Sequence, residues 1–137
     1  MRPFEMSSGN FNPTSSSEID AVVKTVEKYI NGIKTANIET LKQAFYPSAT
    51  MHGYIGDDLS AGPIDPLFAL IEACGPMDGL KSRIDVLDIT GTTAVVRVTM
   101  EHADHDRDYT DFHTLYKQRE GGSWKIIAKV FHLYDRV

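Results

Sequence analysis

Three titratable side chains stand on one predicted β-hairpin, the segment "YTDFHTLYKQREGGSWKIIAKVFHLY" at residues 109–134. Alternate residues of a strand point to opposite faces of a sheet, so Asp111 and His113 share a face on the first strand. On the second strand one phase begins at Trp124 and ends at His132. A carboxyl and two imidazoles on an otherwise apolar face can bind a ligand or move a proton. The pattern therefore predicts a polar-lined apolar cavity behind this hairpin.

The length of the hairpin turn decides which residues face Asp111. A turn of two or four residues around "REGG" places Asp111 opposite Val130 or His132, whereas a three-residue turn reverses the faces. We favour the even-length turn because it leaves one face of the second strand almost wholly apolar. The inward residues are then Trp124, Ile126, Ala128, Val130 and His132. The outward residues are Lys125, Ile127, Lys129, Phe131 and Leu133.

Apolar residues at helical spacing predict helices in the first half of the chain. A helix is expected over residues 17–35, with Ser15 or Ser17 in position to cap it. Asn37 can cap a short second helix that ends before a proline. Asp65, followed by a proline, predicts the start of a third helix over "LFALIEAC". These helices would carry the side chains that face the hairpin.

The strands predicted before the hairpin are residues 48–56, 83–90 and 92–102, and residues 57–63 are expected to be a loop. Alternation is clearest in residues 92–102, where Ala94 and Met100 share an apolar phase. Helices gathered at the start of the chain and an antiparallel run at its end predict an α+β fold. In this fold the helices pack on one face of a curved sheet.

The composition is that of a globular protein, with 42% hydrophobic and 24% charged residues. A net charge of −5 without a basic cluster argues against a nucleic-acid partner, and no apolar run reaches the about 20 residues needed to span a membrane. The lone Cys74 cannot form an internal disulfide, which fits a reducing cytoplasm. Residues 1–16 are expected to be a flexible lead-in to one domain, residues 17–137.

The order of elements, "YPSATMHGYIG" and the closing "TDFHTLYK…GGSWKIIAKVF" resemble the NTF2-like superfamily. The closing motif resembles its branch named "putative lumazine-binding", close to the SnoaL-like polyketide cyclases. This resemblance covers about residues 18–134. It implies a cone-shaped, cystatin-like fold in which a strongly bent antiparallel sheet wraps a long helix around a pocket. It also implies homodimers formed through the sheet.

The ketosteroid isomerases of this superfamily allow a comparison of single residues. Their oxyanion-binding tyrosine falls on Tyr29, and their protonated, hydrogen-donating aspartate falls on Asp111. The resemblance thus implies a donor pair facing a carbonyl or enolate oxygen. Their general-base aspartate falls on Gly53, which cannot take a proton. A histidine would have to replace it, and the candidates are His52, His113 and His132.

The expected function is binding of a small molecule by a protein that needs no cofactor. If the protein is an enzyme, it is an isomerase, cyclase or dehydratase that acts by proton transfer on a small cyclic carbonyl compound. The residues expected to contact the ligand are Tyr29, Met51, Tyr54, Met100, Asp111, Trp124 and His132. The alternative is a non-catalytic dimerisation or interaction module with a vestigial pocket.

A polar segment and the outer face of the hairpin are two further candidate sites in the sequence. The segment "HADHDRD" at residues 102–108 holds histidines and aspartates, but its spacing matches no metal-binding motif, so no metal is expected. The outer face of the hairpin carries Phe112, Tyr116, Ile127 and Phe131, which is more apolar than a free surface requires. We expect this face to form a homodimer.

Overall fold

The computed structural model describes residues 15–119 and 122–135. Its helices are α3 (Ser16–Thr35), α4 (Ile38–Gln43), α5 (Asp65–Cys74) and the short 3-10 helix η1 (Asp104–Asp106). Its strands are β1 (Phe45–Ile55), β2 (Asp58–Pro63), β3 (Lys81–Thr90), β4 (Thr93–Glu101), β5 (Asp108–Lys117) and β6 (Trp124–Tyr134). Most of the predicted lead-in lies outside the described residues, and the division of the chain at residue 16 stays a prediction.

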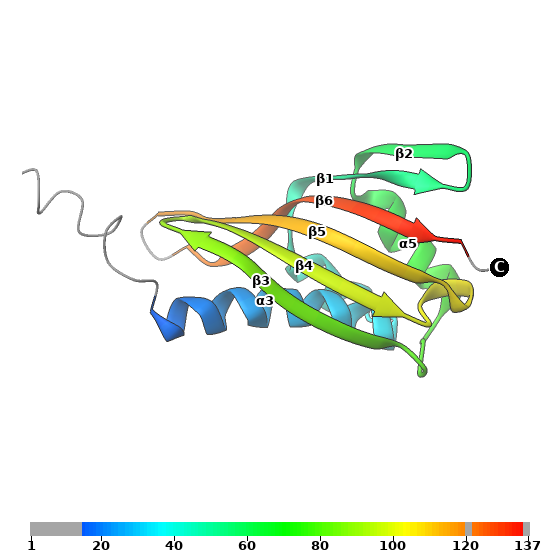
Figure 1. Ribbon diagram of the computed structural model, residues 1–137, viewed down its shortest axis with the longest axis horizontal. Coiled ribbons are helices and arrows are strands. Elements are labelled where there is room, and N and C mark those ends of the chain that lie inside the picture. The colour runs from blue at the N-terminus through cyan, green and yellow to red at the C-terminus, as the bar shows by residue number, and fades with distance from the viewer. Residues whose placement is uncertain (1–14, 120–121, 136–137) are drawn as a thin grey trace, which may run out of the picture.

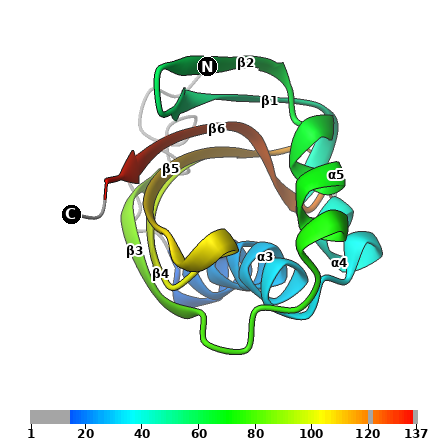
Figure 2. The ribbon, with the colours of Figure 1, turned by 90° about the vertical axis from the view of Figure 1, so that its right-hand side faces the viewer.

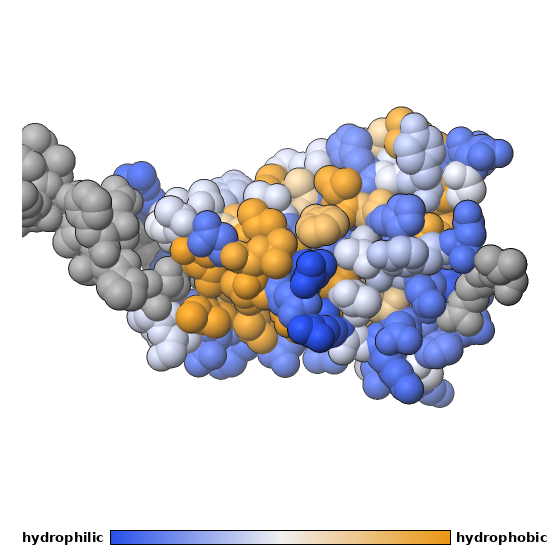
Figure 3. All heavy atoms as spheres, viewed as in Figure 1, coloured by the Kyte–Doolittle hydropathy of each residue, from blue (hydrophilic) through white to orange (hydrophobic). Residues whose placement is uncertain are grey.

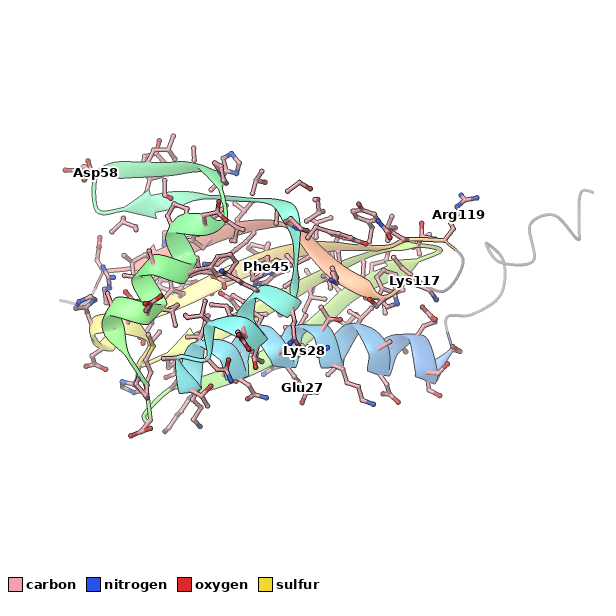
Figure 4. The ribbon with its side chains drawn as sticks, turned by 180° about the vertical axis from the view of Figure 1, so that it is seen from behind. Glu27, Lys28, Phe45, Asp58, Lys117 and Arg119 are labelled. Carbon is pink, nitrogen blue, oxygen red and sulfur yellow. The ribbon has the colours of Figure 1, made fainter. Side chains whose placement is uncertain are left out.

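Helix α3 forms where the apolar spacing predicts it. The Ser15 hydroxyl oxygen accepts a hydrogen bond from the Glu18 backbone amide at 3.3 Å and caps the helix. One face of α3 is buried against the sheet, whereas Glu27 and Lys28, labelled in Figure 4, are exposed. This burial of a single helix face explains why the apolar residues recur at helical spacing.

Of the two caps predicted for the shorter helices, one is confirmed and the other is wrong. The side chain of Asn37 accepts from the Thr40 amide at 3.1 Å and begins α4 as predicted. Asp65 does not cap α5, because the helix begins one residue earlier, after Ile64, which makes no side-chain cap. Asp65 is instead the first helical residue, where its charge still favours the positive end of the helix dipole.

The strands form one six-stranded sheet in the order β2-β1-β6-β5-β4-β3 (Figure 1). Every pair of neighbours is antiparallel except β1 and β6, which are parallel. The sheet curves around α3, and α5 stands beside its open edge (Figure 2). The predicted α+β architecture with helices on one face of a curved antiparallel sheet is confirmed, and the described helices include none long and apolar enough to cross a membrane.

Strand β2 corrects the prediction that residues 57–63 form a loop. It pairs with β1 from Ile55 opposite Asp58 to Thr50 opposite Pro63. Gly56, at φ 61°, supplies the left-handed conformation that the tight connection needs. Apolar and polar residues alternate over residues 58–61, but Leu59 is exposed at the sheet edge, so the strand has no buried face and is recognised by its backbone pairing.

A bulge in β6 changes which residues face the core. Next to the turn, Leu115 lies opposite Ile126, which is the predicted register. Beyond Ile127 the register shifts by one residue, so that Asp111 lies opposite Phe131. The prediction that Asp111 faces Val130 or His132 is therefore wrong, although Asp111 itself points inward as expected.

The shifted phase reverses the side chains of β6 beyond the bulge. Lys129 and Phe131, expected outside, are buried, whereas Val130, expected inside, is 49% exposed. His132 is exposed too, and its ring lies edge-on to Tyr134 with centroids 4.7 Å apart. The bulge thus removes one predicted polar group from the interior and brings in a cation that the alternating pattern places outside.

Candidate functional site

A buried hydrogen-bonded group joins α3 to β5. The Tyr29 hydroxyl donates to Oδ2 of Asp111, and Nε2 of His113 lies 3.3 Å from the same oxygen. The rings of Tyr29 and His113 meet edge-on at 4.5 Å between centroids. All three side chains are fully buried. The structure therefore brings together the three residues expected to be catalytic from the hairpin and the first helix.

The charges in this group differ from those implied by the ketosteroid isomerases. Burial alone would raise the pKa of Asp111, but the nearby charge of Lys129 and the hydrogen bonds from His113 and Tyr29 lower it. Burial lowers the pKa of His113 against the opposing pull of Asp111. Asp111 is thus an ionised acceptor at neutral pH, not the neutral donor expected, and His113 is a neutral donor through Nε2.

The Tyr29 hydroxyl keeps its proton and donates it in the hydrogen bond to Asp111. Burial and the carboxylate of Asp111 raise the pKa of the Tyr29 hydroxyl well above its ordinary value. The second oxygen of Asp111, Oδ1, and Nδ1 of His113 have no hydrogen-bond partner among the described residues. These two buried atoms thus receive no hydrogen bond, and Asp111 carries a negative charge. A buried carboxylate in this state is stabilised by a cation close by.

Lys129 supplies that cation. It lies on β6 just after the bulge and is 4% exposed. Its Nζ is 3.7 Å from Sδ of Met51, 4.8 Å from the ring centroid of Phe131 and 5.8 Å from that of Tyr29. These contacts are weak acceptors for an ammonium group. Sequence reasoning missed this residue because it assumed unbroken alternation along the strand.

A cavity of about 180 Å³ lies beside Lys129, between the curved sheet and α5. Its wall is mainly apolar and includes Met51, Leu67, Ile71, Met100 and Phe131. Its polar wall residues are Ser60, Asp104, Tyr109 and Lys129. A cavity with a few converging polar groups on an apolar wall is the usual form of a small-molecule site.

Only some of the residues predicted to contact the ligand line the cavity. Met51 and Met100 line it, as expected. Tyr29 and Asp111 are not among its wall residues and stand behind Lys129, linked to it by the ring contact and the charge interaction described above. The site is therefore built with Lys129 between the ligand space and the buried Tyr29–Asp111 pair.

The other predicted contacts lie away from the cavity. Tyr54 is 61% exposed, and His52 points outward from β1 because it is one residue out of phase with Met51. Trp124 is buried, and its Nε1 donates to Oε2 of Glu18 at 2.8 Å near the start of α3. These three side chains and the exposed His132 do not converge on the cavity.

Gly53, onto which the resemblance maps the general base of the isomerases, has no room for a larger side chain. A Cβ atom there would lie 2.6 Å from the carbonyl oxygen of Phe131 and 2.7 Å from its ring. The close approach follows from the bulge, because Gly53 and Phe131 are paired across β1 and β6. No side chain can project from residue 53 into the interior, so a base must come from elsewhere.

The segment at residues 102–108 contributes one carboxylate to the cavity wall. Asp104 is buried, forms an ion pair with Arg107 and accepts a hydrogen bond from Tyr109. Burial would raise the pKa of Asp104, but Arg107 and Tyr109 lower it. His102 is exposed and pairs with Asp106 at 2.6 Å. Among residues 15–119 and 122–135, no group of three or more metal-ligating side chains is found.

The geometry can be compared with known proteins. Aldolase FrzH of Cladobotryum sp. is 33% identical over 122 residues, which span 89% of this chain and 96% of that protein. An NTF2-like protein of Methylobacillus flagellatus is 34% identical, with a TM-score of 0.81 over 89% of this chain and 96% of that one. An NTF2-like protein of Shewanella baltica is 32% identical, with a TM-score of 0.82 over 91% and 100%. Both solved structures are described as having unknown function.

A family described as "putative lumazine-binding" matches residues 17–132, from the start of α3 almost to the end of β6. This range contains α3, the bulged hairpin and the whole cavity wall. The chain therefore belongs to the "putative lumazine-binding" family of the NTF2-like superfamily.

Proposed function

We propose that this chain binds a compact, largely apolar carbonyl compound in the cavity and promotes proton transfer at the carbon next to the carbonyl. The observation that carries the proposal is Lys129, a buried ammonium group on an apolar wall whose contacts are a thioether and two aromatic rings. The reaction classes are isomerisation, cyclisation, dehydration and aldol chemistry, all of which pass through an enolate or its equivalent.

The charges around the cavity favour a neutral ligand. Lys129 is balanced by the ionised Asp111, and Arg107 is balanced by Asp104, while Tyr29 is neutral. A neutral carbonyl compound adds no net charge to this buried set, so its entry avoids the large cost of an unpaired ion. Its oxygen would accept a hydrogen bond from Lys129, and this bond would strengthen as negative charge develops on the oxygen.

The relatives support carbonyl chemistry without naming a substrate. The curated relative is an aldolase, and the reaction of an aldolase forms or breaks a bond at the carbon beside a carbonyl. The family description refers to lumazine, a ring compound that carries carbonyl groups, and the cavity volume of about 180 Å³ favours compact ligands. Small cyclic ketones therefore form the first panel to test.

The test is exchange of hydrogen for deuterium at the carbon beside the carbonyl, followed by NMR in D₂O with cyclopentanone and cyclohexanone. We expect exchange above the uncatalysed rate with the full chain and its loss in Lys129→Met. Lys28→Met is the matched control, because Lys28 is exposed on α3 (Figure 4). Equal exchange in both variants would contradict the proposal, and so would exchange at the uncatalysed rate throughout the panel.

A second candidate function, a dimerisation module, is favoured by the outer face of the sheet. Figure 3 shows hydrophobic residues gathered on this face. The exposed apolar residues on the outer sides of β3, β4, β5 and β6 are Leu87, Val95, Phe112 and Val130. Of the predicted residues, Phe112 is exposed on this face and Phe131 points inward, while Tyr116 and Ile127 are half-buried.

We infer that this outer patch pairs two copies of the chain, because such an apolar surface is costly to leave in water. Dimerisation and the cavity are compatible, since the patch and the cavity lie on opposite sides of the sheet. The module without catalysis remains the alternative if every carbonyl compound fails to bind. The cytoplasmic location suggested by the lone Cys74 also stays a prediction.

A further inference from the structure

We propose that Lys129 reacts covalently, as the nucleophile that forms an iminium ion with the carbonyl carbon of the ligand. This inference rests on the proposed function and assigns its chemistry to one atom, Nζ of Lys129. Among the described residues, Lys129 is the only buried lysine, and it is also the only lysine in the cavity wall. An exposed lysine could not combine a fixed position with exclusion of water.

The step balances in atoms and in charge. One ammonium proton first passes to the carbonyl oxygen, which frees the lone pair of the Lys129 nitrogen to form a bond to the carbonyl carbon. A second proton then follows to the oxygen, which leaves as water. One proton stays on nitrogen, so the iminium ion carries the single positive charge that the ammonium ion carried before. Asp111 therefore faces a cation of the same charge before and after the step, and no ion is left unpaired.

The surroundings of Lys129 hold its ammonium group in place. Phe131 and Tyr29 present their rings near this group, and Met51 contacts it through sulfur. A positioned nitrogen reduces the entropy lost on reaction with a bound carbonyl compound. The apolar wall also excludes water, which is the product of iminium formation and the reagent that reverses it.

The base available in the cavity explains why a covalent route suits this site. Gly53 and Phe131 leave no room for the general base of the isomerases. The acidic wall residue is Asp104, a weak base because Arg107 and Tyr109 stabilise its ionised form. An iminium ion makes the adjacent C–H bond much more acidic than a ketone does. The proton can then pass to Asp104 while the C–H electrons form the enamine double bond.

The experiment is reductive trapping on the full chain. The protein is incubated with cyclopentanone or cyclohexanone and sodium cyanoborohydride, which reduces an iminium ion to a stable secondary amine. Peptide mass spectrometry then locates the adduct. We expect it at Lys129 in preference to Lys28 and the other exposed lysines. Adduct spread over the exposed lysines, or none at Lys129, overturns the inference.

Variants separate this inference from the proposed function. Lys129→Arg keeps the positive charge beside Asp111 but cannot form an iminium ion, so deuterium exchange should be lost. Its urea unfolding curve should stay close to that of the unsubstituted chain. Exchange that persists in Lys129→Arg, or exchange without trapping in the unsubstituted chain, refutes the covalent step and leaves the proposed function standing. Trapping at Lys129 without exchange supports the covalent step and refutes the proton-transfer function.

Discussion

The buried imidazole of His113 should make the protein less stable as the pH falls. In the folded chain, burial lowers the pKa of His113 from its ordinary value of 6.5. Below that value the unfolded chain binds more protons than the folded chain, so the free energy of unfolding decreases with falling pH. While the folded imidazole stays neutral, the loss between about pH 7.5 and about pH 5.5 amounts to about 1.4 kcal/mol.

Urea unfolding at several pH values in this range measures the effect in the unsubstituted chain and in His113→Gln. Glutamine can still donate a hydrogen bond to Asp111 but does not titrate, so the variant should lack this part of the pH dependence. Asp111 does not interfere, because its lowered pKa places its own loss of stability below its ordinary value of 3.8. His132→Gln, at an exposed position, is the control and should behave as the unsubstituted chain. Identical pH dependence in His113→Gln and the unsubstituted chain would refute the buried, neutral state of this imidazole.

Three further substitutions test the fold and the outer face. Tyr29→Phe removes the hydroxyl that donates to Asp111 and should cost about 1.5–3 kcal/mol in urea unfolding; an unchanged midpoint would contradict the bond. Gly53→Ala forces a Cβ against the carbonyl of Phe131 and should cost about 1–3 kcal/mol, seen as a lower Tm, whereas an unchanged Tm would deny the close approach. Phe112 is 44% exposed on the outer patch, and Phe112→Asp should convert the dimer to a monomer in sedimentation; a monomeric unsubstituted chain at micromolar concentration would refute the dimer.

The parts of the fold predicted from sequence are those with an uninterrupted apolar period. The buried face of α3 and the alternation along β4 each extend over several turns or pairs, so local pattern and tertiary burial agree. Asp111 and His113 were placed inward correctly because β5 alternates without a break. Strand β2 escaped prediction because it lies exposed at the sheet edge and has no buried face.

The bulge escaped prediction for a different reason. Alternation fixes the face of each residue only while the strand pairs without an insertion, and one extra residue reverses every later side chain. The sequence does hold a signal, since Ile126, Ile127 and Ala128 form an apolar run that breaks the alternation. A cavity behind the hairpin was predicted, but most of its wall was not, because that wall gathers side chains from both halves of the chain.

This one inserted residue accounts for both departures from the isomerase arrangement. It turns Phe131 inward, where it lies against Gly53 and fills the place of a general base. It also turns Lys129 inward, where its charge favours the ionised form of Asp111 over the protonated form. The isomerases have a protonated aspartate that donates a hydrogen bond to an oxyanion. Here Asp111 is instead an anion next to the cation of Lys129. Under the proposed chemistry the cavity acts through the amine of Lys129, and we expect Tyr29 and Asp111, which are not among the wall residues, to position Lys129 rather than touch the ligand.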